Sequence, residues 1–99
     1  MAAKGRQVRL TPLAESDLEE IWHYTFSQWS MDQADSYHRD LISTIEALAC
    51  GTKVGRICTV RDGYWRYAAG SHVIFYREAA QTLDVIRILH QRMDVERHL

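Results

Sequence analysis

Residues 64–89 read YWRYAAGSHVIFYREAAQTLDVIRIL, and this stretch decides the fold. Side chains alternate at a period of two along 64–69 and again along 72–77. The Gly70-Ser71 pair between them is typical of a tight two-residue turn that joins antiparallel strands. The pattern therefore predicts a β-hairpin.

The segment that follows predicts a third strand of a different kind. Residues 79–81 form a turn, and 83–89 is apolar at both odd and even positions. Side chains of both parities are buried only when a strand is covered on both faces. We therefore expect 83–89 to lie inside the sheet.

Two amphipathic helices precede the strands. Thr11-Pro12 is a favourable helix start, with Thr as N-cap and Pro in the first turn, and it predicts a helix over 12–28. Ser30-Met-Asp-Gln33 has the form of a capping box, which predicts a second helix over 31–50. With almost no loop between them, the helices must form an antiparallel hairpin. The positions at helical spacing are Leu18, Ile21, Trp22, Thr25 and Trp29 in the first helix and Ala34, Tyr37, Leu41, Ile45 and Leu48 in the second.

A short alternating segment at 8–11, ended by Pro12, completes the order as a first strand. The order β-α-α-β-β-β predicts a single α+β domain over residues 1–99. The helical hairpin then packs on one face of a small, mainly antiparallel sheet. The first strand belongs either at an edge or beside the first hairpin strand, and 51–63 is predicted to be loop.

Two helices can cover only one face of this sheet, so something else must cover the other. The candidates are the tail, residues 90–99, or a partner protein, because exposed aromatic surface usually marks an interaction site. We expect Trp65, Tyr67, Val73 and Phe75 on one face, and Tyr64, Ile74 and Tyr76 on the other.

The aromatic residues of the first helix divide between core and surface. Trp22 and Trp29 fall on the apolar stripe and are predicted to be core residues. Tyr24 and Phe26 lie off that stripe, which makes them candidates for a second interface. His23 and His38 are expected on the surface.

The charge is distributed unevenly. Residues 1–50 carry four Lys/Arg against eight acids, whereas 51–99 carry eight Lys/Arg against five acids. The second half can meet an acidic protein or a phosphate backbone, or it can simply be a solvated sheet edge.

Nothing in the sequence indicates a metal or a cofactor. Cys50 and Cys58 lack a CxxC spacing and are expected to be reduced, and the five His show no zinc-site spacing. No apolar run reaches the roughly 20 residues of a membrane span, and the first residues lead into no signal-peptide core. A cytoplasmic protein is expected.

The candidate chemistry rests on arginines of successive strands. Arg66, Arg77 and Arg87, with His90 nearby, can in principle hold a phosphodiester and move a proton, as a metal-free ribonuclease requires. The competing interpretation is that these arginines pair with Asp84, Glu78 or the carboxylates of a partner.

Taken together, the residues resemble the ParE toxins of the RelE/ParE superfamily. The resemblance covers about residues 8–95, and its two C-terminal motifs are the most specific. The matching positions are Leu10-Thr-x-x-Ala14-x-x-Asp17-Leu18-x-x-Ile21-x-x-Tyr24, Ala34-x-x-Tyr37-x-x-x-Leu41, Gly70-x-His72-x-Ile74-Phe75-Tyr76-Arg77 and Arg87-Ile-Leu-His90-x-Arg92-Met-Asp94.

The resemblance implies a RelE/ParE-like fold and the toxin of a type II toxin–antitoxin system. ParE toxins inhibit DNA gyrase, and a ParD-like ribbon-helix-helix antitoxin neutralises them in a heterotetramer or larger complex that binds operator DNA only through the antitoxin. The alternatives are a RelE-like ribosome-dependent mRNA endoribonuclease or a degenerate, non-toxic module that binds antitoxin.

The implied contact residues fall into two groups. We expect His90, Arg92, Met93 and Asp94 to bind the target. They begin a tail whose sequence shows neither the helical nor the strand periodicity of a core segment. The expected antitoxin contacts are Tyr24, Phe26, Trp65, Tyr67 and Phe75.

Overall fold

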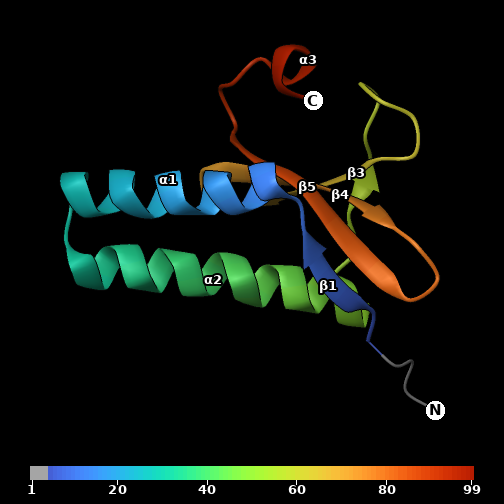
Figure 1. Ribbon diagram of the computed structural model, residues 1–99, viewed down its shortest axis with the longest axis horizontal. Coiled ribbons are helices and arrows are strands. Elements are labelled where there is room, and N and C mark those ends of the chain that lie inside the picture. The colour runs from blue at the N-terminus through green and yellow to red at the C-terminus, as the bar shows by residue number, and fades with distance from the viewer. Residues whose placement is uncertain (1–4) are drawn as a thin grey trace.

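A computed structural model describes residues 5–99 (Figure 1). Residues 1–4 lie outside the described residues. They are part of the expected domain and of the segment in which we expect no signal peptide. The predicted β-α-α-β-β-β order is confirmed, with a two-residue strand added in the predicted loop and a short helix added in the tail. The elements are β1 (Gln7–Leu10), α1 (Pro12–Gln28), α2 (Met31–Cys50), β2 (Arg56–Ile57), β3 (Trp65–Ala69), β4 (His72–Glu78), β5 (Thr82–His90) and α3 (Val95–His98).

Local capping explains where the two long helices begin and end. The Thr11 side chain accepts a hydrogen bond from the Ala14 amide at 3.0 Å, and Ser30 accepts one from the Gln33 amide at 3.1 Å. Gly51 ends α2 in the left-handed conformation, with φ of 84°. These signals lie within three residues of each helix end, which is why the sequence predicts the boundaries correctly.

The five strands form one sheet in the order β1-β5-β4-β3-β2. β1 pairs in parallel with β5, and every other neighbouring pair is antiparallel. The predicted interior position of the last strand is therefore confirmed, as is an edge position for the first. The alternative placement of the first strand beside β3 is wrong.

The predicted division of aromatic residues between the two faces of the sheet is wrong. The two-residue turn pairs Ala69 with His72, so Trp65 stands opposite Tyr76 and Tyr67 opposite Ile74. Directly opposed residues share a face, and here an odd-numbered residue always meets an even-numbered one. Trp65 and Tyr67 consequently lie on the helix side, together with Ile74 and Tyr76.

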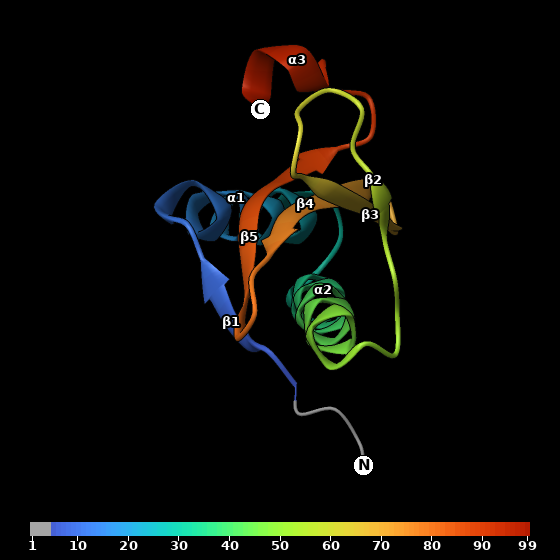
Figure 2. The ribbon, with the colours of Figure 1, turned by 90° about the vertical axis from the view of Figure 1, so that its right-hand side faces the viewer.

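The sheet separates two apolar clusters. Figure 2 shows β3, β4 and β5 between α2 on one side and α3 on the other. We call the larger cluster, between the sheet and the long helices, the helix-face core. The smaller one, the tail-face core, is covered by Val95 and Leu99 of the tail. Of the two candidates for covering this face, the tail and a partner protein, the tail therefore covers these residues. The helix-face core comprises Ala14, Leu18, Ile21, Leu41, Ile45, Leu48, Ala49, Ile74, Tyr76, Leu83, Val85 and Ile88, and the tail-face core comprises Cys58, Val73, Phe75 and Leu89, with Tyr64 packed against it.

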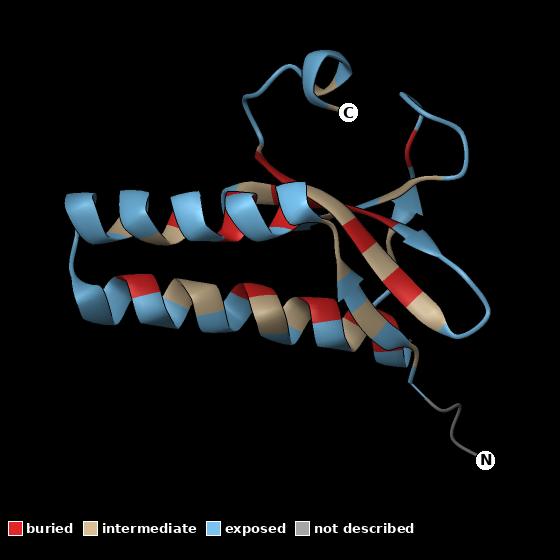
Figure 3. Ribbon diagram, in the orientation of Figure 1, coloured by how far each residue is buried: buried red, intermediate tan, exposed pale blue. Residues whose placement is uncertain are grey.

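The far end of the helical hairpin extends beyond the sheet (Figures 1 and 3). Ile21 is the last buried residue of α1. Trp29 is 74% exposed, and Trp22 is only half-buried, so the prediction that both are core residues is wrong. Their spacing is correct for the apolar stripe, but no sheet lies opposite that part of the helix. Within residues 5–99, no helix combines the length and apolarity that crossing a membrane requires.

Candidate functional site

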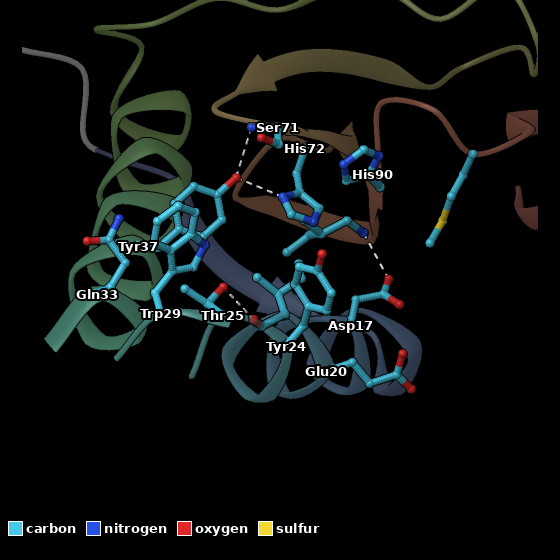
Figure 4. A pocket seen from close by; sticks show the side chains of 13 residues that line it. Asp17, Glu20, Tyr24, Thr25, Trp29, Gln33, Tyr37, Ser71, His72 and His90 are labelled. Carbon is cyan, nitrogen blue, oxygen red and sulfur yellow. Dashed lines mark hydrogen bonds between the residues drawn. The ribbon is translucent and has the colours of Figure 1, made fainter. Parts of the chain in front are cut away.

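A groove opens between the helical hairpin and the end of the sheet where β4 begins and β5 ends (Figure 4). Its volume is about 580 Å³. Tyr24 of α1 and Trp29, the residue that caps the end of this helix, form one wall, and both are largely exposed, at 65% and 74%. We call it the aromatic groove. Its remaining lining includes Gln33 and Tyr37 of α2, His72, Ile88 and His90 of the sheet, and Met93 of the tail.

The floor of the groove is a hydrogen-bonded cluster centred on Tyr37. The Tyr37 hydroxyl lies 2.7 Å from Nδ1 of His72 and accepts a hydrogen bond from the Ser71 amide at 3.0 Å. Burial raises the pKa of Tyr37 above its ordinary value. Gly70 makes this approach possible, because a Cβ there would lie 2.6 Å from the Tyr37 hydroxyl. Gly70 therefore has two roles: it forms the turn that sets the hairpin register, and it leaves space for the Tyr37 hydroxyl.

Two histidines lie side by side on the sheet wall of the groove. The ring centroids of His72 and His90 are 5.3 Å apart, and the rings are nearly perpendicular. Burial, with the neighbouring His90 as a second cause, lowers the pKa of His72 to about 4. His72 is therefore neutral at neutral pH.

Asp17 and Arg87 connect α1 to the sheet just beyond the end of β1. Asp17 Oδ2 and Oδ1 accept hydrogen bonds from Arg87 Nε at 2.8 Å and Arg87 Nη2 at 2.9 Å. Asp17 Oδ2 also accepts one from the Ile88 amide at 2.9 Å. The hydrogen bonds from Asp17 raise the pKa of Arg87. Arg87 Nη1 donates to the carbonyl of His98 at 3.0 Å, so this one side chain also holds the tail.

The four residues of the predicted ribonuclease cluster are not brought together. The guanidinium groups of Arg66 and Arg77 lie 5.7 Å from the ring centroids of Phe75 and Tyr64, on the tail side of the sheet. Arg87 is occupied by Asp17 and the tail. His90 lines the aromatic groove on the helix side. The alternative that sheet arginines pair with carboxylates is correct for Arg87, but its partner is Asp17 rather than Asp84 or Glu78.

The predicted target-binding residues straddle the end of β5. His90 and Met93 line the aromatic groove, and Met93 is 45% exposed. Arg92 is exposed, while its amide donates to His90 Nδ1 at 3.2 Å. Asp94 caps α3 by accepting from the Glu96 amide at 3.2 Å, so its carboxylate has a structural partner.

The predicted antitoxin contacts do not form one surface. Tyr24 lines the groove, whereas Phe26 stacks on Trp22 at a centroid distance of 5.4 Å. Trp65 and Tyr67 are part-buried against the helix-face core. Phe75 is 0% exposed within the tail-face core, so its prediction as a surface contact is wrong. Its register on β4 turns it away from solvent and under the tail.

The sequence reasoning missed the residues that build the groove floor and its anchor. Tyr37 and His72 are 35 positions apart, and Asp17 and Arg87 are 70 apart, so no local spacing connects them. All four stand at positions of the family motifs, which was the one available signal. Within residues 5–99, no three His, Cys, Asp or Glu side chains gather as a metal site would require.

Comparisons with known proteins agree on one family. The model of the ParE toxin of type II toxin–antitoxin systems, parDE, matches residues 8–95. Toxin ParE1 of Mycobacterium tuberculosis strain H37Rv is 48% identical over 92 residues, which cover 91% of this chain and 94% of that protein.

Solved structures agree on the fold. The chromosomal ParDE toxin–antitoxin system from P. aeruginosa contains a chain that matches with a TM-score of 0.76 at 16% identity, over 86% of this chain and 95% of that one. The RelBE2 toxin–antitoxin complex from Mycobacterium tuberculosis gives 0.66 at 18% identity, over 90% and 94%. These likenesses show a RelE/ParE fold. From the family model and the close relative together, the chain belongs to the ParE toxins of type II toxin–antitoxin systems.

Proposed function

We propose that this toxin acts by inhibiting DNA gyrase and is neutralised by direct binding of a ParD-like antitoxin. The observation that carries the proposal is the family match over residues 8–95, since gyrase inhibition is what the resemblance to ParE toxins implies. The toxin then works by binding rather than by cutting a substrate.

The arrangement of the arginines supports binding over catalysis. A metal-free ribonuclease needs cationic groups converging on one phosphodiester. Here Arg87 is held by Asp17, and Arg66 and Arg77 lie on the opposite side of the sheet from His90.

The aromatic groove is the surface we assign to the antitoxin. Tyr24 and Trp29, which line the groove, are large side chains that are each more than half exposed, at 65% and 74%. A continuous hollow with such a rim suits the apolar face of an amphipathic helix. The ParDE system from P. aeruginosa shares this fold, which favours a ParD-like partner here.

The tail residues Arg92 and Met93, with His90, are the contacts we assign to the target. They are exposed or line the open groove, so a macromolecule can reach them. Because His90 and Met93 belong to the groove as well, an antitoxin seated there covers part of the target surface. Neutralisation then follows from occlusion.

A supercoiling assay with purified gyrase tests the proposal. Wild-type toxin is expected to block supercoiling and, when expressed without antitoxin, to stop growth with a DNA-damage response. Arg92→Ala should weaken inhibition, whereas the matched control Arg56→Ala, an exposed arginine on β2, should not. Unchanged supercoiling at toxin concentrations well above those of gyrase contradicts the proposal.

The two remaining interpretations have their own readouts. Primer extension on translated mRNA would reveal new cleavage sites if the chain were a RelE-like endoribonuclease, and we expect none. A degenerate module would bind antitoxin and leave growth unaffected. Light scattering on the purified complex checks the expected heterotetramer or larger assembly.

A further inference from the structure

The two histidines of the aromatic groove each use the same ring nitrogen for a hydrogen bond within the protein. His90 Nδ1 lies 3.2 Å from the backbone nitrogen of Arg92. A backbone amide can only donate, so Nδ1 of His90 must be the unprotonated acceptor. In the neutral ring the proton then sits on Nε2.

The Tyr37 hydroxyl contacts the corresponding nitrogen of His72. It accepts from the Ser71 amide, and it lies 2.7 Å from His72 Nδ1 and 3.3 Å from the Ala69 carbonyl. Either group can donate across the 2.7 Å contact, and the site proposed below requires that Tyr37 donates to His72 Nδ1. His72 then also carries its proton on Nε2.

Both Nε2–H groups are free to bind something else. Neither Nε2 has a hydrogen-bond partner within residues 5–99. Among these residues, the one side-chain polar atom that is both buried and without a partner is Asp84 Oδ1. Both Nε2 atoms are therefore accessible to solvent. His72 and His90 stand together on the sheet wall of the groove, with ring centroids 5.3 Å apart (Figure 4). The site offers two donors and no acceptor of its own.

The charges around this pair leave the donors available. Asp17 of α1 is the acid whose charge acts on His72, but it is satisfied by Arg87 and the Ile88 amide. The Glu20 side chain is turned away from the two imidazoles (Figure 4). From α2, the facing titratable group is the Tyr37 hydroxyl, which remains neutral because burial raises its pKa.

We propose that the Nε2–H groups of His72 and His90 form a two-donor site that binds the carboxylate of an Asp or Glu side chain in the docking segment of the antitoxin. A carboxylate has two acceptor oxygens and no donor, which complements this pair. A Lys or Arg side chain finds no free acceptor on that wall. Tyr24 and Trp29, on the opposite wall, receive the apolar neighbours of the acidic residue.

This inference rests on the proposed antitoxin function. Each histidine already uses Nδ1 for a hydrogen bond within the protein, so Nε2 is the ring nitrogen that remains to meet the carboxylate.

The first test needs no antitoxin. Nitrogen-15 NMR of the imidazoles in the free toxin at neutral pH is expected to show the Nε2–H tautomer for His72 and His90. The Tyr37→Phe variant should return His72 to a mixture of tautomers. An Nδ1–H form at either histidine in the wild type overturns the inference without touching the proposed function.

The second test measures affinity for the proposed ParD-like antitoxin. His90→Leu removes the donor and is expected to weaken binding roughly tenfold or more, as for a hydrogen bond to a charged group. His90→Gln keeps a donor and should recover most of the affinity. His23→Leu, at an exposed histidine of α1 that does not line the groove, is the matched control.

The carboxylate itself is identified by exchange in the partner. Each Asp and Glu of the antitoxin segment is replaced in turn by Asn or Gln, and each variant is combined with His90→Leu in a double-mutant cycle. One position should couple to His90, and the others should add independently. Tight wild-type binding with no such coupling overturns the inference alone, whereas no binding by the wild type overturns the proposed function with it.

Discussion

The helix face and the tail face of the sheet are held in different ways. The helix face buries twelve residues beneath helices of 17 and 20 residues, whereas the tail face buries four beneath a loop and a four-residue helix. Burial of apolar side chains is the main stabilising term, so the helix face carries most of the stability. The tail can open at a small cost while the rest of the fold remains intact.

Arg87 is where the two faces meet. It donates to Asp17, which belongs to α1, and to the carbonyl of His98, which belongs to the tail. Substitutions that break the contacts of Arg87 therefore measure the stability of both faces together. Substitutions within one core measure the stability of that face alone. Four predictions follow from the difference between the faces.

The largest effect is expected from Asp17→Asn. The Arg87 charge, on a side chain only 17% exposed, then lacks its partner, and breaking a buried pair costs about 3–5 kcal/mol. Urea denaturation measures the change. Glu78→Gln breaks the Arg6–Glu78 pair at 3.8 Å, whose side chains are 35% and 32% exposed. It serves as control, with an expected loss of about 0–1 kcal/mol. Similar losses for both variants would contradict the special position of Asp17.

A matched pair of truncations compares the two cores directly. Ile45→Ala, at a helix-face residue 1% exposed, should cost about 3 kcal/mol through lost burial and the cavity left behind. Leu99→Ala, on the tail face, should cost about 1 kcal/mol because that side chain is only part-buried. Denaturation midpoints with unchanged m-values would confirm the order. Equal costs would mean that the tail face is as tightly packed as the helix face.

Removal of residues 95–99 should separate the faces most visibly. The deletion uncovers Val73, Phe75 and Leu89 and removes the Arg87–His98 hydrogen bond. We expect a loss of only about 1–2 kcal/mol, since little apolar area is lost and the ordering entropy of the tail is recovered. Binding of the dye ANS should rise, while the circular dichroism of the helices is retained. Complete unfolding would show that the tail is essential to the fold.

The smallest effect concerns pH and the groove on the helix face. The pKa of His72 is about 4, below its ordinary value of 6.5, so the unfolded chain binds a proton that the folded chain does not. The stabilisation is present above pH 6.5 and is lost as the pH falls toward 4. Allowing for the partial exposure of the ring, we expect about 1 kcal/mol. Denaturation at pH 7 and pH 5 measures it, and His72→Gln should remove that part of the pH dependence.

Much of the fold could be predicted because its signals are local. The Thr11 cap, the Ser30 cap and Gly51 set the helix ends through contacts within a few residues. The apolar parity of 83–89 correctly indicated an interior strand. The faces of β3 and β4 were predicted wrongly, because strand parity has to be combined with the pairing that the turn imposes. Trp29 was misplaced because periodicity does not say how far the sheet extends.

The candidate site was predicted less well than the fold. His90, Met93 and Tyr24 were expected to make contacts and do line the groove, although what binds there remains a proposal. Arg66 and Arg77 were grouped with Arg87 because all three stand on neighbouring strands. Arg66 and Arg87 both stand opposite Phe75 and so share the tail face, but His90 lies on the helix side of the sheet. Arg87 is also held by the carboxylate of Asp17, 70 residues away.

The sequence by itself determined the two long helices, the four longer strands, their order and, through its motifs, the family. Those properties depend on backbone preferences and side-chain spacing over a few residues, which can be read along one chain. Only the tertiary structure decided that Asp17 meets Arg87 and that Tyr37 meets His72. Such contacts depend on the register of strands and the seating of helices, where a shift of one residue changes every partner.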